Sequence, residues 1–354
     1  MDGTALVICD GYFDTPVGKT AHGLVRGTDR YRVVGVIDAR HAGRDAGEVL
    51  DGTPSGIPIF SRLGEAIASL PEKPDYLVLG MATDGGVLPP EVRPALLEAL
   101  RLGINVDSGL HQPLREDPEF VAAAEAGGAR VRDIRRCKPI RELHFFEGKI
   151  EEVGALRIAV LGTDSAVGKR TTARLLTQSL RERGIKAEMI GTGQTAWFQG
   201  VKYCMFLDAT INDFVAGEIE HAVHQAWVAE RPRVILLEGQ GCLTNPAFPG
   251  GFELLAAGRP HATILQHAPR RRHYDGFPAY PLAGLEREKA LIELLSQRPV
   301  VAIAINHEGM TREEIDAVVA EYEERYGIAA ADPLVHGVEK LVAALESRFP
   351  EAFS

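Results

Sequence analysis

The sequence predicts an α/β protein made of two doubly wound domains with mainly parallel sheets. Short apolar, β-branched runs alternate with amphipathic stretches, which is typical of parallel strands covered by helices on both faces. A length of 354 residues exceeds that of one average domain. Near the middle of the chain, a glycine-rich run containing a lysine lies between an apolar strand-like segment and a helical pattern.

In the first half, helical patterns at 89–102 and 119–126 lie among apolar runs that have the length of buried strands. These runs are 5–9, 33–37, 76–81 and 104–106. Ligands of such folds gather at the carboxyl ends of the strands. Asp38 closes the second run, where dinucleotide-binding folds place a ribose-binding acid, but the first loop lacks the G-x-G-x-x-G fingerprint. His111, in the loop after the fourth run, is a candidate substrate-binding residue.

The glycine-rich run Gly162-Thr163-Asp164-Ser165-Ala166-Val167-Gly168-Lys169-Arg170-Thr171-Thr172 follows the apolar segment 158–161. Main-chain N–H groups of a tight loop and the following helix N-terminus attract phosphate, and a lysine adds a mobile positive charge. The second domain is therefore predicted to have a P-loop NTPase-like fold. We expect cofactor contacts from Gly162, Thr163, Asp164, Ser165, Val167, Gly168, Lys169, Arg170, Thr171 and Thr172.

This loop departs from the standard G-x-x-x-x-G-K-[ST] pattern in two ways. The first glycine and the Gly-Lys pair are one residue further apart, and Arg170 stands where a hydroxyl normally holds Mg²⁺. Either Thr171 or Thr172 could supply that hydroxyl, or the loop could hold a phosphate ester that needs no metal. Both alternatives remain open from the sequence.

Polar residues follow other strand-like runs of the second half. Gly191, Thr192 and Gln194 follow the run 187–190 and are candidate substrate contacts, because glycines and hydroxyls at a strand end allow close approach. Asp208 and Asp213 are candidate catalytic acids or bases. Asp213 also suits the N-cap of the helix expected over 215–229.

Three further candidates follow the later strands. Glu238 ends the run 234–237, where P-loop folds place the carboxylate that handles Mg²⁺ or its water, and it is also a candidate base. Arg271 lies in a run of three arginines after 262–266 that could clamp a carboxylate or phosphate. Asn306 follows 300–305 and could read a nucleobase or cap the next helix.

The helical periodicity stops between the two halves, at a proline and several charged residues. We expect a Rossmann-like domain over 1–135, a connector over 136–154 and a P-loop domain over 155–354. A net charge of −10 argues against a broad nucleic-acid surface. No apolar run approaches membrane-spanning length, no secretory signal is recognised, and the four cysteines form no C-x-x-C pair, so we expect a cytoplasmic protein.

The second-half motifs resemble those of dethiobiotin synthetase and related amide-forming P-loop enzymes, which carry a Gly-Thr-Asp-x-x-Val-Gly-Lys-Thr loop and a Glu-Gly pair like Glu238-Gly239. Arg170 departs from that pattern. Over nearly the whole chain, the sequence resembles one bacterial family, long described as a domain of unknown function, with a Rossmann-like domain before the P-loop domain. The best-known activity of that family is D-glutamate N-acetyltransferase.

The resemblance implies N-acetylation of D-glutamate or a similar amino acid, with acetyl-CoA bound through the P-loop. Asp208, Asp213 or Glu238 would then serve as the base. The main alternative is an ATP- and Mg²⁺-dependent amide-forming ligase in which Glu238 holds the metal. A nucleotide-sensing regulatory protein is a second alternative. We expect a small amino acid as partner, neither nucleic acid nor membrane, and a homo-oligomer.

Overall fold

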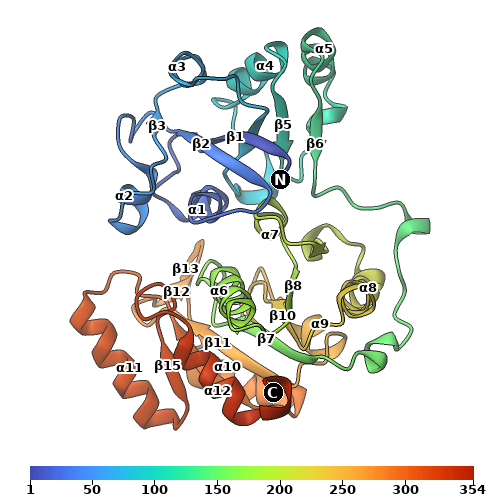
Figure 1. Cartoon of the computed structure of the whole chain (residues 1–354), viewed down its shortest axis with the longest axis vertical. Helices are drawn as coiled ribbons and strands as arrows, with labels where there is room; N and C mark the ends of the chain where they lie inside the picture. The colour runs from blue at the N-terminus through green and yellow to red at the C-terminus, as the bar shows by residue number, and fades with distance from the viewer. The chain divides into compact units, whose positions relative to one another are not determined.

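The computed structural model describes residues 1–354, which divide into two compact units. Unit 1 comprises residues 1–137 and 194–201, and unit 2 comprises residues 138–193 and 202–354. Each unit contains a parallel sheet with helices along its connections (Figure 1). The predicted fold class is therefore confirmed.

Unit 1 is built on a six-stranded parallel sheet in the order β3-β2-β1-β4-β5-β6. Its elements are β1 (Gly3–Ile8), α1 (Lys19–Val25), β2 (Tyr31–Ile37), α2 (Ala46–Asp51), β3 (Ile59–Phe60), α3 (Leu63–Ser69), β4 (Tyr76–Leu79), α4 (Arg93–Arg101), β5 (Asn105–Ser108), α5 (Pro118–Gly127), β6 (Val131–Asp133) and α7 (Gln194–Phe198). Helix α4 starts later than the expected 89–102, because Pro94 occupies its first turn and the prolines at 89 and 90 precede it in turn structure.

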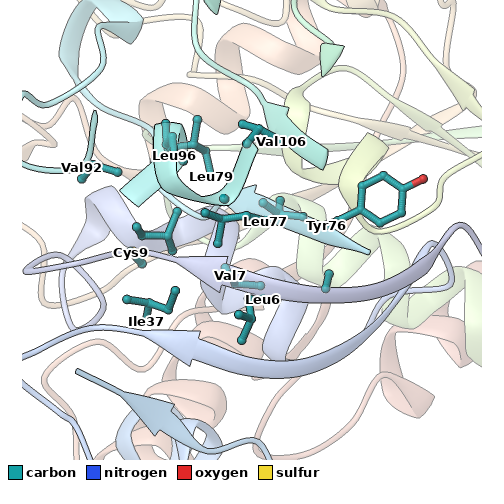
Figure 2. Close-up of a cluster of buried hydrophobic side chains, with 14 of the residues drawn as sticks. Leu6, Val7, Cys9, Ile37, Tyr76, Leu77, Leu79, Val92, Leu96 and Val106 are labelled. Carbon is teal, nitrogen blue, oxygen red and sulfur yellow. The ribbon is translucent and has the colours of Figure 1, made fainter. Parts of the chain in front are cut away.

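The core of unit 1 consists of the apolar side chains that its strands and helices bury together. Figure 2 shows Leu6 and Val7 of β1 beside Leu77 and Leu79 of β4, with Val106 of β5 nearby. Strands β1 and β4 pair in parallel, with Leu6 opposite Leu77. Strands β1 and β4 are each buried on both faces, which explains why their sequences are continuous apolar runs.

Helix α7 joins unit 1 although its sequence lies in the second half of the chain. Phe198 belongs to the unit 1 core and is fully buried. The Thr195 and Thr20 hydroxyl oxygens lie 2.9 Å apart, and Gln199 Nε2 donates to Gly23 O over 2.7 Å. The predicted P-loop domain over 155–354 is contiguous and does not include this exchange.

Unit 2 is built on a seven-stranded parallel sheet in the order β15-β14-β11-β7-β10-β8-β9, with a separate antiparallel pair β12-β13. Its elements are β7 (Leu156–Gly162), α6 (Lys169–Glu182), β8 (Ala187–Gly191), β9 (Tyr203–Cys204), α8 (Asn212–Glu230), β10 (Val234–Glu238), α9 (Phe252–Ala256), β11 (Ala262–His267), β12 (His273–Tyr274), β13 (Phe277–Pro281), α10 (Leu285–Ser296), β14 (Val300–Ile305), α11 (Arg312–Tyr326), β15 (Ala329–Ala331) and α12 (Glu339–Arg348). None of the helices is both long and apolar enough to cross a bilayer.

Two buried glutamates of α8 hold the connector against unit 2. Glu218 accepts hydrogen bonds from Lys138 Nζ over 2.7 Å and from His144 N over 2.9 Å. Burial pushes the pKa of Glu218 upward, but these bonds outweigh it and leave the pKa below its ordinary value. Glu220 accepts from Glu147 N over 2.7 Å. Both carboxylates therefore bind the connector.

Candidate phosphate-binding site

The glycine-rich loop forms a tight turn between β7 and α6. Strand β7 ends at Gly162 and helix α6 begins at Lys169. Ala166 and Gly168 both have left-handed backbones, with φ of 52° and 107°. That conformation is uncommon for a residue other than glycine and costs on the order of 1–3 kcal/mol. Such turns make concave arrays of N–H groups that suit anions.

The loop leaves main-chain donors open. The N–H groups of Ala166 and Gly168 donate to no acceptor within the protein. Gly162 lies so close to the lysine side chain that an added Cβ would be 2.9 Å from Lys169 Cδ. The loop is therefore narrow at this point, and its open N–H groups are donors of the kind that bind anions.

Lys169 is buried and folded back over the loop. Its side chain is only 6% exposed, and Nζ donates to Asp164 O over 2.6 Å and to Gly241 O over 2.9 Å. Carbonyl acceptors are neutral, so a phosphate oxygen can replace one of them with a stronger charge-assisted bond.

Asp164 is an acid inside the loop, yet its carboxylate is fully buried and turned toward protein donors. Oδ1 accepts from Asn245 Nδ2 over 2.9 Å. Oδ2 accepts from Arg271 Nη1 over 3.0 Å and from Asp275 N over 2.8 Å. Arg271, which the sequence analysis offered as an anion clamp, thus engages the loop itself.

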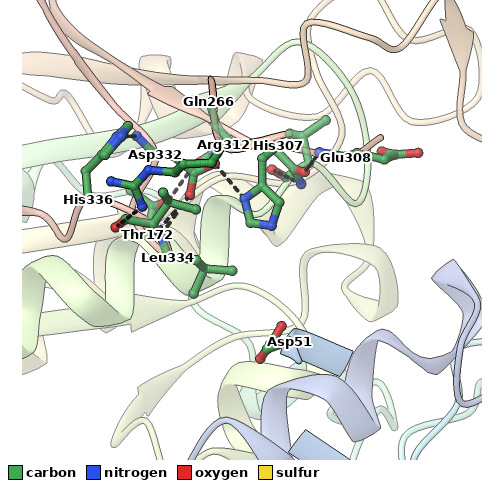
Figure 3. Close-up of polar contacts among 12 residues, drawn as sticks. Asp51, Thr172, Gln266, His307, Glu308, Arg312, Asp332, Leu334 and His336 are labelled. Carbon is green, nitrogen blue, oxygen red and sulfur yellow. Dashed lines mark hydrogen bonds and ion pairs between the residues drawn. The ribbon is translucent and has the colours of Figure 1, made fainter. Parts of the chain in front are cut away.

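Strands β11 and β14 also support the loop. Asn306 Nδ2 donates to Val167 O over 2.9 Å. Thr172 Oγ1 in α6 donates to Gln266 Oε1 at the end of β11 (Figure 3). The Thr163 hydroxyl lies 2.8 Å from His267 Nδ1, and burial lowers the pKa of His267 to about 4, so this imidazole stays neutral at physiological pH.

Glu238 ends β10, the strand that pairs with β7, and is placed opposite Val160. Its carboxylate is only 6% exposed and accepts from Thr192 N over 2.8 Å. Burial raises the pKa of Glu238 above its ordinary value, and the charges of Arg170 and Lys169 only partly offset that rise. A carboxyl group with a raised pKa is suited to proton transfer near neutral pH.

The two candidate aspartates differ in position. Asp208 lies in a short 3-10 helix at Leu207–Ala209, and its charge contributes to the raised pKa of Glu238. Asp213 is exposed in the first turn of α8, whose N-cap residue is Ile211. Asp213 therefore does not cap this helix, and a negative charge in its first turn is favourable in itself.

Two of the candidate substrate contacts fall in unit 1. Gln194 is the first residue of α7, and its Nε2 donates to Thr20 Oγ1 over 3.3 Å. His111 is exposed after β5, and its backbone N would lie 2.6 Å from a Cβ added to Gly86. Gly191 and Thr192, by contrast, lie beside Glu238 in unit 2, where Thr192 Oγ1 also donates to Glu238 O over 3.0 Å.

Comparison with known proteins identifies the family of this chain. The family described as "Domain of unknown function (DUF1611_C) P-loop domain" matches residues 144–342, and its Rossmann-like partner, DUF1611_N, matches residues 39–137. The chain belongs to the DUF1611 family. A crystal structure of a DUF1611 family protein from Anabaena variabilis has a TM-score of 0.88 and 27% identity, covering 97% of this chain and 99% of that one.

Two curated relatives carry an activity in their names. A protein from Tritonibacter scottomollicae named "D-glutamate N-acetyltransferase" is 37% identical over 278 residues, which cover 76% of this chain and 80% of that protein. A protein of the same name from a Pseudoalteromonas species is 31% identical over the same coverage. The P-loop fold of the DUF1611 chain is consistent with either acetyl-CoA or a nucleotide as ligand.

Some of the residues that build the site were not predicted from the sequence. Asn245, Asp275 and Gln266 each bond the loop or the start of α6. Asn245 stands before a proline in a glycine-rich stretch, a pattern that signals a turn and nothing more. No group of three or more His, Cys, Asp or Glu side chains is arranged to hold a metal ion.

Proposed function

We propose that this DUF1611 protein transfers an acetyl group from acetyl-CoA to the amino group of D-glutamate. The observation that carries the proposal is the 37% identity to a curated D-glutamate N-acetyltransferase over 76% of the chain. The narrow loop with open N–H groups at Ala166 and Gly168 supports a phosphate-bearing donor such as acetyl-CoA.

Glu238 is the proposed base of this reaction. The amine nitrogen of D-glutamate attacks the thioester carbonyl, the C–N bond forms, the C–S bond breaks and CoA leaves as a thiol. The amine must lose a proton, and the buried carboxylate of Glu238, with its raised pKa, is suited to accept it. Main-chain N–H groups of the stretch 191–194, apart from that of Thr192, which already donates to Glu238, would stabilise the developing oxyanion.

Arg170 supports a reaction without a metal ion. It replaces the hydroxyl that normally holds Mg²⁺ in a P-loop, and its positive charge acts on Glu238. A guanidinium beside this carboxylate offers a fixed cation where a ligase would need Mg²⁺.

The test is thiol release from acetyl-CoA by the purified full-length protein with D-glutamate and no added nucleotide. L-glutamate and the Lys169→Ala variant serve as controls, and mass spectrometry identifies N-acetylglutamate. We expect release with D-glutamate well above both controls. Thiol release at background level with D-glutamate, together with Mg²⁺-dependent ATP consumption, would contradict the transferase proposal and favour an amide-forming ligase.

A further inference from the structure

Side chains from outside the phosphate-binding loop hold two of its carbonyl groups. Arg271 Nη1 donates to Ser165 O over 2.7 Å, and Asn306 Nδ2 donates to Val167 O over 2.9 Å. Arg271 follows β11 and Asn306 follows β14, the two strands on the same side of β7 in the sheet order. Each contact therefore fixes the orientation of one loop peptide from a neighbouring strand.

The orientation of a peptide determines where its N–H group points. All peptide bonds of the chain are trans, so each C=O and the following N–H point in opposite directions. The N–H groups that follow the carbonyls of Ser165 and Val167 belong to Ala166 and Gly168. Both of these N–H groups lack an acceptor within the protein. Holding the two carbonyls therefore aims the two open donors.

Arg271 also pairs with the buried carboxylate of Asp164 inside the loop. A carboxylate such as that of Asp164 would repel phosphate, and a buried charge without a partner is costly. Arg271 is only 10% exposed, and Nη1 lies 3.0 Å from Asp164 Oδ2 while Nη2 lies 2.6 Å from Glu308 Oε2. Its guanidinium is thus bound to three groups of the protein and offsets the charge of Asp164, while it shares its own charge with Glu308.

We propose that Arg271 and Asn306 are positioning residues that aim the N–H groups of Ala166 and Gly168 at the ligand phosphate. From the sequence alone, Arg271 is a candidate for binding a substrate anion and Asn306 for binding a nucleobase. The contacts favour the positioning role for both residues. The inference deepens the proposed function, because it concerns the loop that would hold acetyl-CoA. It applies equally to any other phosphate ligand of that loop.

The first test compares Arg271→Met with Arg272→Met, a matched control at the neighbouring exposed arginine. Calorimetry on the full-length protein measures the Kd for CoA, and kinetics give the KM of each substrate. We expect Arg271→Met to raise the Kd and the KM for acetyl-CoA about tenfold or more, with the KM for D-glutamate unchanged and the control like wild type. An unchanged Kd for CoA, or a raised KM for D-glutamate alone, would overturn the positioning role.

A double variant separates positioning from direct ligand contact. Asp164→Asn removes the charge that Arg271 neutralises, so Asp164→Asn combined with Arg271→Met should recover part of the lost CoA affinity. The gain from Asp164→Asn should be larger in Arg271→Met than in the wild-type background, whereas an equal gain in both backgrounds would show that Arg271 acts independently of Asp164, as a direct ligand contact would. The double variant also keeps the test informative if Arg271→Met alone fails to fold.

Asn306→Ala tests the second residue with two probes, CoA and inorganic pyrophosphate. A positioning role predicts that both bind more weakly by the same factor, whereas weakening of CoA alone would identify Asn306 as a base reader and overturn the inference. The pyrophosphate measurement does not depend on acetyl transfer. A wild-type protein that binds pyrophosphate but neither binds nor uses CoA would refute the proposed function and leave the loop geometry testable.

Discussion

The carboxyl ends of the two parallel sheets contrast in how their polar groups are satisfied. In unit 1, the carboxylate of Asp38 is fully buried after β2 and accepts from Phe13 N over 3.1 Å and from Arg40 N over 2.9 Å. The chain's own donors therefore occupy the acid that a dinucleotide fold would offer to a ribose. In unit 2, the open donors of Ala166 and Gly168 lie at the corresponding edge of the sheet.

The contrast teaches that the fold offers a place for a site without determining whether a site is built there. Both units have parallel strands with polar loops at the carboxyl edge. In unit 2, a loop with left-handed residues and a buried lysine lies one strand away from a carboxylate with a raised pKa, that of Glu238 at the end of β10. We therefore propose that the chemistry takes place in unit 2 and that Asp38 has a structural role.

The largest expected effect is on catalysis by Glu238→Gln. The amide cannot accept the proton of the substrate amine, so kcat should fall by roughly 10²–10⁴-fold. The Kd for CoA should change little, because Gln can still accept the bond from Thr192 N. Steady-state thiol release and calorimetry measure the two quantities, and a kcat within about threefold of wild type would remove Glu238 from the mechanism.

The raised pKa of Glu238 also predicts two pH effects. The active carboxylate is lost as pH falls through that raised pKa, so kcat should decline on the acid side at a pH above the usual range for glutamate. Folding stability should change with pH in the opposite direction from kcat. Because the pKa of Glu238 is higher in the folded state, this residue stabilises the fold below its unfolded pKa, and the contribution is lost as pH rises through the folded pKa. The Tm of Glu238→Gln should therefore exceed that of wild type at pH 8, by about 2–4 °C for each kcal/mol gained in the free energy of unfolding. Near pH 4 the two Tm values should be equal.

Lys169→Ala should have the next largest effect, on ligand affinity. Loss of a charge-assisted contact of about 1.5–3 kcal/mol weakens CoA binding roughly 10–150-fold. Lys19→Ala is the matched control, because Lys19 follows a similar Val-Gly pair in unit 1. Equal affinity in Lys169→Ala and wild type would show that the loop is structural.

Asp38→Asn tests the unit 1 side of the comparison. Weakened bonds to Phe13 N and Arg40 N should cost about 1–3 kcal/mol of stability, measured as a lower Tm or a lower denaturant midpoint. The KM for acetyl-CoA and for D-glutamate should stay at the wild-type values. A raised KM at unchanged stability would show that Asp38 binds a ligand, and the two sheet edges would then not differ in function.

The smallest expected effect is that of metal removal. With Arg170 in place of the metal-binding hydroxyl, EDTA should leave kcat and KM unchanged. In Arg170→Thr, which restores the standard pattern, added Mg²⁺ should begin to strengthen ATP binding. Loss of wild-type activity in EDTA that Mg²⁺ restores would contradict the metal-free assignment.

Local sequence order was sufficient to predict the succession of strand, loop and helix around Lys169 and the position of Glu238 at the end of its strand, because each of these segments is contiguous. The partners of Asp164 could not be predicted in this way. Asn245, Arg271 and Asp275 lie 81, 107 and 111 residues further along the chain. Which side chains meet a buried carboxylate depends on the packing of several loops, and that packing leaves no local pattern.

The same limit applies to α7. Its short sequence has the pattern of an ordinary strand-to-helix turn. The hydrogen bond from Gln199 to Gly23 joins residues that are 176 positions apart in the chain. The burial of Phe198 in the unit 1 core is a consequence of tertiary packing. The predicted domain organisation, which rests on contiguous segments, has no means of describing such an exchange.

The most direct measurement is a crystal structure of the full-length protein with CoA. We predict that phosphate oxygens of CoA lie within hydrogen-bond distance of the main-chain N atoms of Ala166 and Gly168, with Lys169 Nζ moved from Asp164 O or Gly241 O to the phosphate. CoA phosphates bound elsewhere, with Lys169 still donating to both carbonyls, would contradict the account.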